Sequence, residues 1–138
     1  MFIGVVGFIV RDKSVPYFEI GYWLQTSKTG FGYITEAVGL VEQYAFHDLL
    51  ALRLEIRMAA SNLKSQGVAK RCGYEAEATL INSRRLPSGE IDSTMIYAKT
   101  RCNKPFDQSK QTANTWYFKF QICSELTLNF KTRRYIVF

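Results

Sequence analysis

The sequence predicts an α/β fold: a mixed, mostly antiparallel sheet with a central βαβ unit and flanking helices. Two apolar segments, about 2–10 and 17–25, are separated by a polar stretch, which is typical of an antiparallel hairpin. A helical pattern follows the second segment and precedes a third strand, and this order makes the second and third strands parallel. The length of 138 residues corresponds to one domain.

The first segment has no basic n-region and no small-residue cleavage site, and it meets charged residues after Val10, so it predicts a buried strand and neither a signal peptide nor a membrane span. The helix predicted over about 33–49 has apolar residues at the i, i+3, i+4, i+7 spacing of a helix that packs on a sheet. Leu52 to Met58 is rich in large apolar side chains and predicts the strand that completes the βαβ unit.

A second helix is predicted over about 63–72, because Asn62 is a good N-cap and Gly73 suits the positive φ at a helix C-terminus. Two later strands, Glu75 to Asn82 and Thr94 to Lys99, predict a hairpin that closes the sheet.

The most informative stretch is a strand, a glycine loop and a helix in immediate succession. Gly30 and Gly32 leave the main chain unshielded directly before the predicted helix. Backbone N–H groups at a helix N-terminus lack partners and lie at the positive end of the helix dipole. A phosphate can therefore approach them where no Cβ intervenes, although two glycines alone are equally consistent with a plain turn.

Five consecutive segments resemble the GNAT superfamily of acetyl-CoA-dependent N-acetyltransferases, within it the ribosomal-protein N-terminal acetyltransferase branch. They cover about residues 2–98 and are Gly4 to Ile9, Glu19 to Leu24, Gly30 to Ala37, Arg53 to Arg57, and Asn62 to Tyr74. The resemblance implies a GNAT-like acetyl-CoA-binding core over residues 1–100. It also implies acetyl transfer to a primary amine, with a protein N-terminal α-amine as the expected acceptor.

The resemblance implies that the CoA pyrophosphate binds the N–H groups of the glycine loop, with the Thr35 hydroxyl as a further donor. The pantetheine arm is expected to pair with the second strand where that strand separates from the third. The family usually has Gln or Arg at the position of Ser27, as a phosphate contact, and here Lys28 is expected to take that role. Asn62 either orients CoA or only caps its helix. The expected cofactor-binding residues are Tyr22, Trp23, Leu24, Lys28, Gly30, Phe31, Gly32, Tyr33, Ile34, Thr35 and Asn62.

Ser65 and Glu19 are the expected catalytic residues. The resemblance places Ser65 beside the CoA sulfur, where its hydroxyl can donate a proton to the leaving thiolate; the alternative is a solvated helix-surface serine. Glu19 is expected to act as general base through water, although strand carboxylates are usually only solvated. Other basic side chains either contact CoA phosphates or are solvated: Lys64, Lys70 and Arg71.

Members of the family normally have a strand and two helices ahead of the segment that starts here at Phe2. Those elements form much of one wall of the acceptor site. An alternative function is therefore a truncated, catalytically silent domain that binds CoA or a partner. A sheet face or aromatic surface left open can pair with a second chain, so a homodimer is one expected assembly.

Residues 101–138 form a basic, aromatic-rich extension that does not resemble the family. They hold seven Lys and Arg against two Asp and Glu, whereas residues 1–100 hold eleven against ten. Strands are expected at Trp116 to Phe120 and at Arg134 to Phe138. Interleaved aromatics and cations also occur on single-strand nucleic-acid surfaces. Because packed strands use aromatics more often, we expect the extension to pack on the core without specific nucleic-acid binding.

The three cysteines, Cys72, Cys102 and Cys123, are odd in number and lack metal-like spacing. We therefore expect reduced thiols in a cytoplasmic protein. The single histidine, His47, cannot supply a metal cluster, so no metal site is expected.

Overall fold

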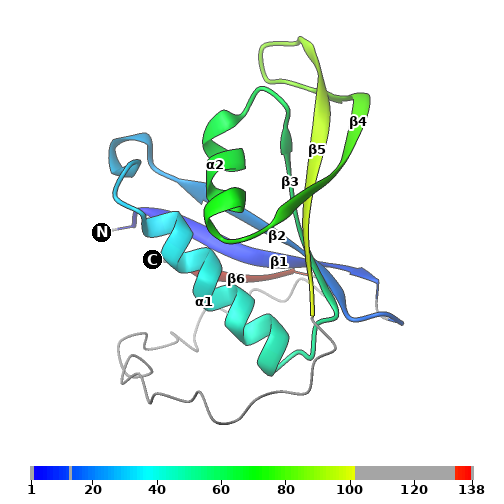
Figure 1. The fold of residues 1–138 in the computed structure, drawn as a ribbon. Helices are drawn as coiled ribbons and strands as arrows, with labels where there is room; N and C mark the ends of the chain where they lie inside the picture. The colour runs from blue at the N-terminus through cyan, green and yellow to red at the C-terminus, as the bar shows by residue number, and fades with distance from the viewer. Residues whose placement is uncertain (1, 13, 102–132, 138) are drawn as a thin grey trace.

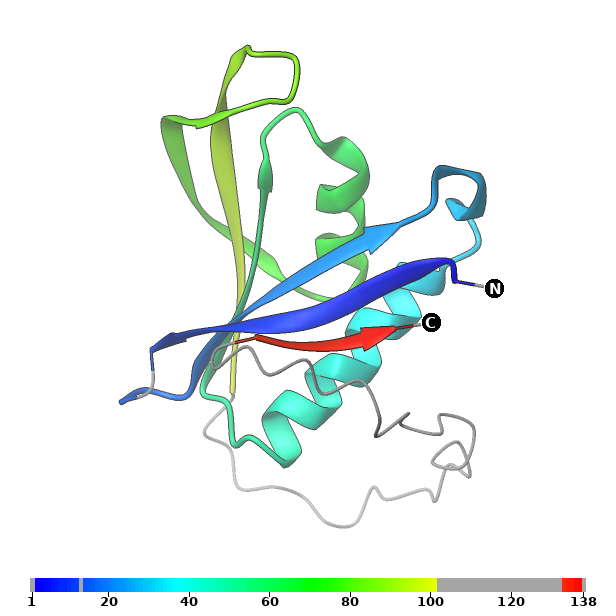
Figure 2. The ribbon, with the colours of Figure 1, turned by 180° about the vertical axis from the view of Figure 1, so that it is seen from behind.

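The computed structural model describes residues 2–12, 14–101 and 133–137. The strands are β1 (Gly4–Asp12), β2 (Tyr17–Leu24), β3 (Arg53–Ala59), β4 (Glu75–Arg85), β5 (Ile91–Thr100) and β6 (Arg133–Val137), and the α-helices are α1 (Tyr33–His47) and α2 (Leu63–Arg71). The strands form one sheet in the order β4-β5-β3-β2-β1-β6 (Figures 1 and 2). β2 and β3 are parallel, and the other neighbours are antiparallel. The predicted fold class is confirmed.

The core lies between one face of the sheet and the two helices. Alternate residues of β1, β2, β3 and β5 point to this face, while α1 and α2 contribute the apolar stripes that the sequence predicted. The largest fully buried side chains come from four elements and are Val6, Ile20, Val38, Val41, Leu54 and Ile56. Burial of each such side chain is worth roughly 1.5–3 kcal/mol.

Several predicted boundaries are wrong by a few residues. α1 ends at His47, two residues before its predicted end, and β5 begins at Ile91, three residues before its predicted start. β4 continues to Arg85, because its pairing with β5 resumes after an irregularity between Leu80 and Arg84. This interruption breaks the period-two pattern, so the sequence predicts only the part of the hairpin before it.

The parallel strands β2 and β3 separate soon after they meet. They pair at three positions only, Tyr17 with Arg53, Phe18 with Leu54 and Glu19 with Glu55. Beyond Glu19, β2 still pairs with β1 on its other side, up to Leu24 opposite Gly4. Figure 1 shows β2 and β3 diverging, with α2 beside β3 on the side of the opening. Over residues 20–24, none of the described strands pairs with the side of β2 that faces β3.

The last described strand, β6, pairs antiparallel with the outer edge of β1, from Val5 opposite Val137 to Ile9 opposite Arg133. This agrees with the strand predicted near the C-terminus. The strand predicted at Trp116 to Phe120 lies outside the described residues. Packing of the whole extension on the core therefore stays a prediction. In the described ranges, neither helix is long and apolar enough to cross a membrane.

Candidate functional site

A glycine loop connects β2 to α1. The chain leaves β2 through a short 3₁₀ turn at Thr26–Lys28 and then passes Gly30 (φ 91°) and Gly32 (φ 81°). Both φ values lie in the left-handed region that side chains with a Cβ disfavour. A Cβ at either glycine would meet no protein atom within 4 Å, so the space beside the loop is open.

The N-terminus of α1 is left without a side-chain cap. Gly32 occupies the N-cap position, and the first helical bond runs from the Glu36 N–H to the Gly32 carbonyl (3.0 Å). The N–H groups of Tyr33, Ile34 and Thr35 precede that bond, so they have no acceptor within the helix. Three free N–H groups at the positive end of a helix dipole suit an anion such as a phosphate.

The N-terminus of α2 is different, because its own chain caps it. The Asn62 side-chain oxygen accepts a hydrogen bond from the Ser65 N–H (3.1 Å). Asn62 therefore has the capping role, which the sequence left open beside a role in orienting CoA. Of the two helices, α1 is the one whose first turn remains available to a ligand.

Side chains of the loop divide between core and surface. Ile34 is buried and belongs to the hydrophobic core, so it offers a ligand only its main chain. Phe31 and Tyr33 are exposed and stack on each other with ring centroids 5.8 Å apart. Lys28 is half-buried at the end of the 3₁₀ turn.

The structure brings to the loop one of the cations that the sequence left as either a contact for CoA phosphates or a solvated side chain. Arg71, at the end of α2, donates a hydrogen bond from Nε to the Thr35 hydroxyl (3.3 Å). The two residues are 36 positions apart, so no local pattern indicates their contact. A guanidinium beside the open helix end adds a positive charge suited to a phosphate.

Ser65 lies against β2 through the side chain of Tyr22. The phenol oxygen of Tyr22 is 2.7 Å from the Ser65 hydroxyl oxygen and 3.2 Å from the Ser65 carbonyl oxygen. Burial raises the pKa of Tyr22, and the hydrogen bond with Ser65 opposes that rise. Ser65 is half-buried.

Trp23 and Leu24 complete the free part of β2, and their side chains point to opposite faces. Trp23 is exposed and stacks on Phe2, with ring centroids 5.9 Å apart. Leu24 is half-buried and packs against the core. The main chain of both residues lies beyond the last pairing with β3.

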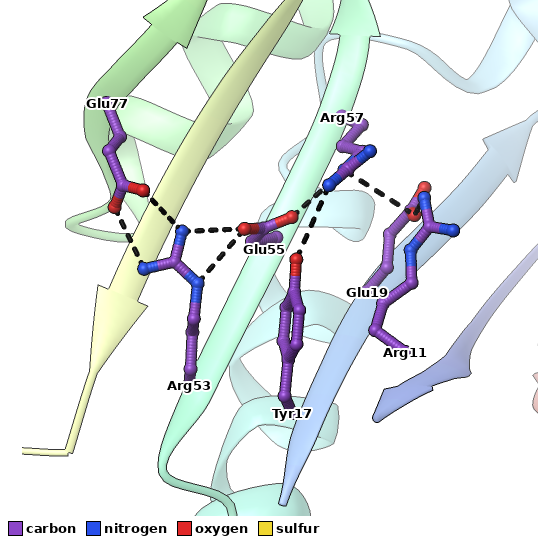
Figure 3. Close-up of polar contacts among 7 residues, drawn as sticks. All are labelled: Arg11, Tyr17, Glu19, Arg53, Glu55, Arg57 and Glu77. Carbon is purple, nitrogen blue, oxygen red and sulfur yellow. Dashed lines mark hydrogen bonds and ion pairs between the residues drawn. The ribbon is translucent and has the colours of Figure 1, made fainter. Parts of the chain in front are cut away.

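Glu19 belongs to a charged network on the face of the sheet away from the helices (Figure 3). Its carboxylate forms an ion pair with Arg11, and a longer one with Arg57 at 3.9 Å. Glu55 lies between Arg57 and Arg53, at 2.9 Å and 2.6 Å. Glu19 and Glu55 form the last pair of β2 and β3, so the network ends where the strands separate.

The network keeps its carboxylate charges although part of it is buried. Glu55 is only 3% exposed, and burial alone would raise its pKa. Hydrogen bonds with Tyr17, Arg53 and Arg57 outweigh burial, so the pKa of Glu55 lies below its ordinary value. Hydrogen bonding to Glu77 raises the pKa of Arg53. The arginines therefore hold Glu55 as a carboxylate.

The two expected catalytic residues lie on different faces of the sheet. Ser65 contacts Tyr22 on the helix face, while Glu19 points into the charged network on the other face. No described contact joins Ser65 to Glu19. Both nevertheless border the opening between β2 and β3, so an extended molecule in that opening would have the hydroxyl on one side and the carboxylate on the other.

Comparison with known proteins identifies the family. The model of the acetyltransferase (GNAT) domain matches residues 1–75, which include β1, β2, the glycine loop, α1, β3 and α2. The chain belongs to the GNAT acetyltransferase family. This confirms the membership that the sequence motifs predicted.

Among its relatives, the "Probable N-acetyltransferase YjcK" of Bacillus subtilis (strain 168) is 43% identical over 69 residues, which are 50% of this chain and 38% of YjcK. The ribosomal-protein-serine acetyltransferase of Escherichia coli (strain K12) is 34% identical over 98 residues, 70% of this chain and 54% of that protein. The second agrees with the predicted ribosomal-protein branch. The chain thus spans about half or less of the length of these relatives.

A solved GNAT structure with bound ligands has the same fold. The microcin C7 self-immunity acetyltransferase MccE, in complex with acetyl-CoA and AMP, superposes with a TM-score of 0.63 and 33% identity. The match covers 72% of this chain and 54% of MccE.

Proposed function

We propose that this GNAT chain transfers an acetyl group from acetyl-CoA to a primary amine. The observation that carries the proposal is the early separation of β2 from β3, followed by a glycine loop that leads into an uncapped α1. The opening offers unpaired main chain for an extended arm, and the loop offers N–H groups for an anion. Acetyl-CoA has both parts, a pantetheine arm and a pyrophosphate.

The described residues fit acetyl-CoA on two counts. The space where a Cβ of Gly30 or Gly32 would stand is open, so the main chain of residues 30–35 is accessible to a pyrophosphate. Arg71 and the half-buried Lys28 place positive charge near that loop. Tyr22, Trp23 and Leu24 would bind the pantetheine arm through their main chain, in the manner of an added strand.

In the reaction, acetyl-CoA supplies the acetyl group and a thiol leaving group. Glu19 would accept the proton of the attacking amine, through water, on the charged face. A main-chain N–H of β2 would hold the developing oxyanion, a type of contact worth about 3 kcal/mol. Ser65 would donate a proton to the departing sulfur from the helix face.

For the acceptor, a protein N-terminal α-amine is the proposed substrate. It is supported by the Escherichia coli relative, which is named a ribosomal-protein-serine acetyltransferase. The proposed compartment is the cytoplasm, and a homodimer is the proposed assembly if the open face of the sheet pairs with a second copy. A catalytically silent CoA-binding domain is not favoured, because Ser65 and Glu19 both border the opening.

Calorimetry with acetyl-CoA, followed by a thiol-release assay, tests the proposal. We expect micromolar affinity, about 8 kcal/mol of binding free energy, and thiol release that depends on an added amine. A panel of Ala- and Ser-starting peptides, their N-acetylated forms and a polyamine distinguishes α-amines from other acceptors. No binding heat up to millimolar acetyl-CoA would overturn the proposal. Binding without turnover for any amine would identify the silent domain instead.

A further inference from the structure

We infer that Tyr22 acts with Ser65 as a two-residue proton donor, in which the phenol resupplies the serine hydroxyl as it protonates the leaving thiolate. The inference rests on the proposed function. It assigns a role to the Tyr22 side chain, whereas the site described above uses only the Tyr22 main chain.

The geometry places the two hydroxyl groups as a pair. Their oxygens are 2.7 Å apart, within the range of a strong O–H···O hydrogen bond. The Asn62 cap holds the main chain of Ser65 at 3.1 Å, and the Tyr22 phenol also reaches the Ser65 carbonyl at 3.2 Å. Ser65 is therefore fixed from two directions, and its hydroxyl is oriented by Tyr22.

The position of Tyr22 on β2 links the pair to the opening. Tyr22 lies three residues beyond Glu19, the last residue of β2 that pairs with β3. An arm that pairs with this free main chain passes directly beside the Tyr22–Ser65 pair on the helix face. Among the described residues, the charged or titratable groups that influence Tyr22 are Arg71 and Cys72, at the end of α2, and Tyr22 in turn influences Tyr74.

The chemistry favours a pair over a single serine. A serine hydroxyl is a much weaker acid than a phenol, whose ordinary pKa is about 10, and a thiol has an ordinary pKa of about 8.5. When the carbon–sulfur bond breaks, its electron pair goes to sulfur, and sulfur takes the proton of the Ser65 hydroxyl. Ser65 takes the proton of Tyr22 in the same event, and the phenolate regains a proton from solvent. Charge is thus never left on the serine oxygen.

The experiment compares four proteins with the parent: Tyr22→Phe, Ser65→Ala, the double variant, and Tyr97→Phe. Tyr97 is the matched control, because its phenol donates to Gln66 of α2 (3.2 Å), the neighbour of Ser65, but does not contact the hydroxyl pair. Acetyl-CoA and CoA affinity is measured by calorimetry, and turnover by thiol release. The pKa of the bound CoA thiol is measured from its ultraviolet thiolate absorbance, with desulfo-CoA as the blank.

We expect Ser65→Ala to lower kcat about 100-fold and Tyr22→Phe at least tenfold, with KM and CoA affinity within threefold of the parent. The double variant should be no slower than Ser65→Ala alone, since the two groups act as one unit. Both single variants should raise the pKa of the bound CoA thiol, because a hydrogen-bond donor that stabilises the thiolate is lost. Tyr97→Phe should match the parent.

Three results would overturn the inference. The first is a Tyr22→Phe protein that keeps the kcat and the bound-thiol pKa of the parent. The second is a Tyr97→Phe protein as slow as Tyr22→Phe, which would show that loss of any phenol against α2 is enough. The third is additive loss in the double variant. If the parent shows no calorimetric binding of CoA, the proposed function fails as well, and this outcome is distinct from the others. The thiol titration needs no acceptor, so it tests the pair even where turnover is absent.

Discussion

The guanidinium Nε of Arg71 lies 3.3 Å from the hydroxyl oxygen of Thr35, so the last turn of α2 meets the first turn of α1. This contact places a cation beside the only described α-helix N-terminus that has no side-chain cap. The loop for which the sequence predicted phosphate binding therefore has beside it a cation from a different element.

Replacement of Gly32 by Val should weaken acetyl-CoA binding by more than tenfold. The new Cβ would occupy the open space beside the loop, and the positive φ of 81° would be strained. Calorimetry measures the affinity, and circular dichroism checks the fold. Gly89→Ala is the control, because Gly89 has a similar φ of 92° in the β4–β5 turn and also open space around it. Equal affinity in a folded Gly32→Val protein would make the loop only a turn.

Replacement of Arg71 by Gln should reduce acetyl-CoA affinity about fivefold at low salt, because a charge beside the pyrophosphate is lost. The deficit should shrink as ionic strength rises, since added salt screens the charge in the parent. Calorimetry at two salt concentrations measures both effects. Arg84→Gln, on the far edge strand β4, is the control and should bind like the parent. A loss of the same size in the control would contradict a local role for Arg71.

Replacement of Glu19 by Gln should lower kcat/KM about 100-fold and leave acetyl-CoA affinity unchanged, because a general base acts on the acceptor amine. Steady-state thiol release and calorimetry separate the two quantities. Glu77→Gln is the control, since Glu77 belongs to the same charged network through Arg53 but lies away from the opening. Undiminished turnover in Glu19→Gln would leave Glu19 with a purely structural ion pair.

Stability should depend on pH through Glu55. Because hydrogen bonds lower the pKa of Glu55 in the folded state, its stabilising contribution is present above the ordinary Glu pKa of about 4.3. That contribution is lost as the pH falls through the lower, folded-state pKa. Urea unfolding should therefore show Glu55→Gln less stable than the parent by about 2 kcal/mol at pH 7, with a smaller difference at pH 3. Glu90→Gln, in the exposed turn, is the control. A difference that does not change with pH would contradict the assignment.

Removal of residues 102–138 should lower the free energy of unfolding. β6 pairs with five residues of β1, and each lost hydrogen bond costs about 1 kcal/mol net. Urea unfolding of the chain ending at Arg101 measures the loss. We further expect the intact chain to bind single-stranded nucleic acid only weakly. A fragment that unfolds cooperatively at the parent's urea midpoint, together with strong salt-sensitive nucleic-acid binding by the intact chain, would make the extension a nucleic-acid arm.

Local patterns in the sequence were enough to predict the order of strands and helices, the parallel βαβ unit and the glycine loop. Each depends on residues near one another in the chain: the spacing of apolar side chains in α1, the cap at Asn62, and Gly30 and Gly32 before a helix. The family resemblance added two further predictions: acetyl-CoA as the ligand, and Ser65 as the candidate proton donor. The ends of the β4–β5 hairpin were missed, because the irregularity after Leu80 breaks the alternation on which strand prediction depends.

The tertiary structure alone shows which of these residues meet. Tyr22 and Ser65 are 43 positions apart, and their contact depends on how far β2 continues past its pairing with β3. Arg71 reaches Thr35 only because α2 packs beside α1. Glu19 lies on the opposite face from Ser65 because side chains alternate along a strand, and the strand register decides which face each one takes. Register and packing arise from the free energy of the whole core, and no short segment of sequence contains them.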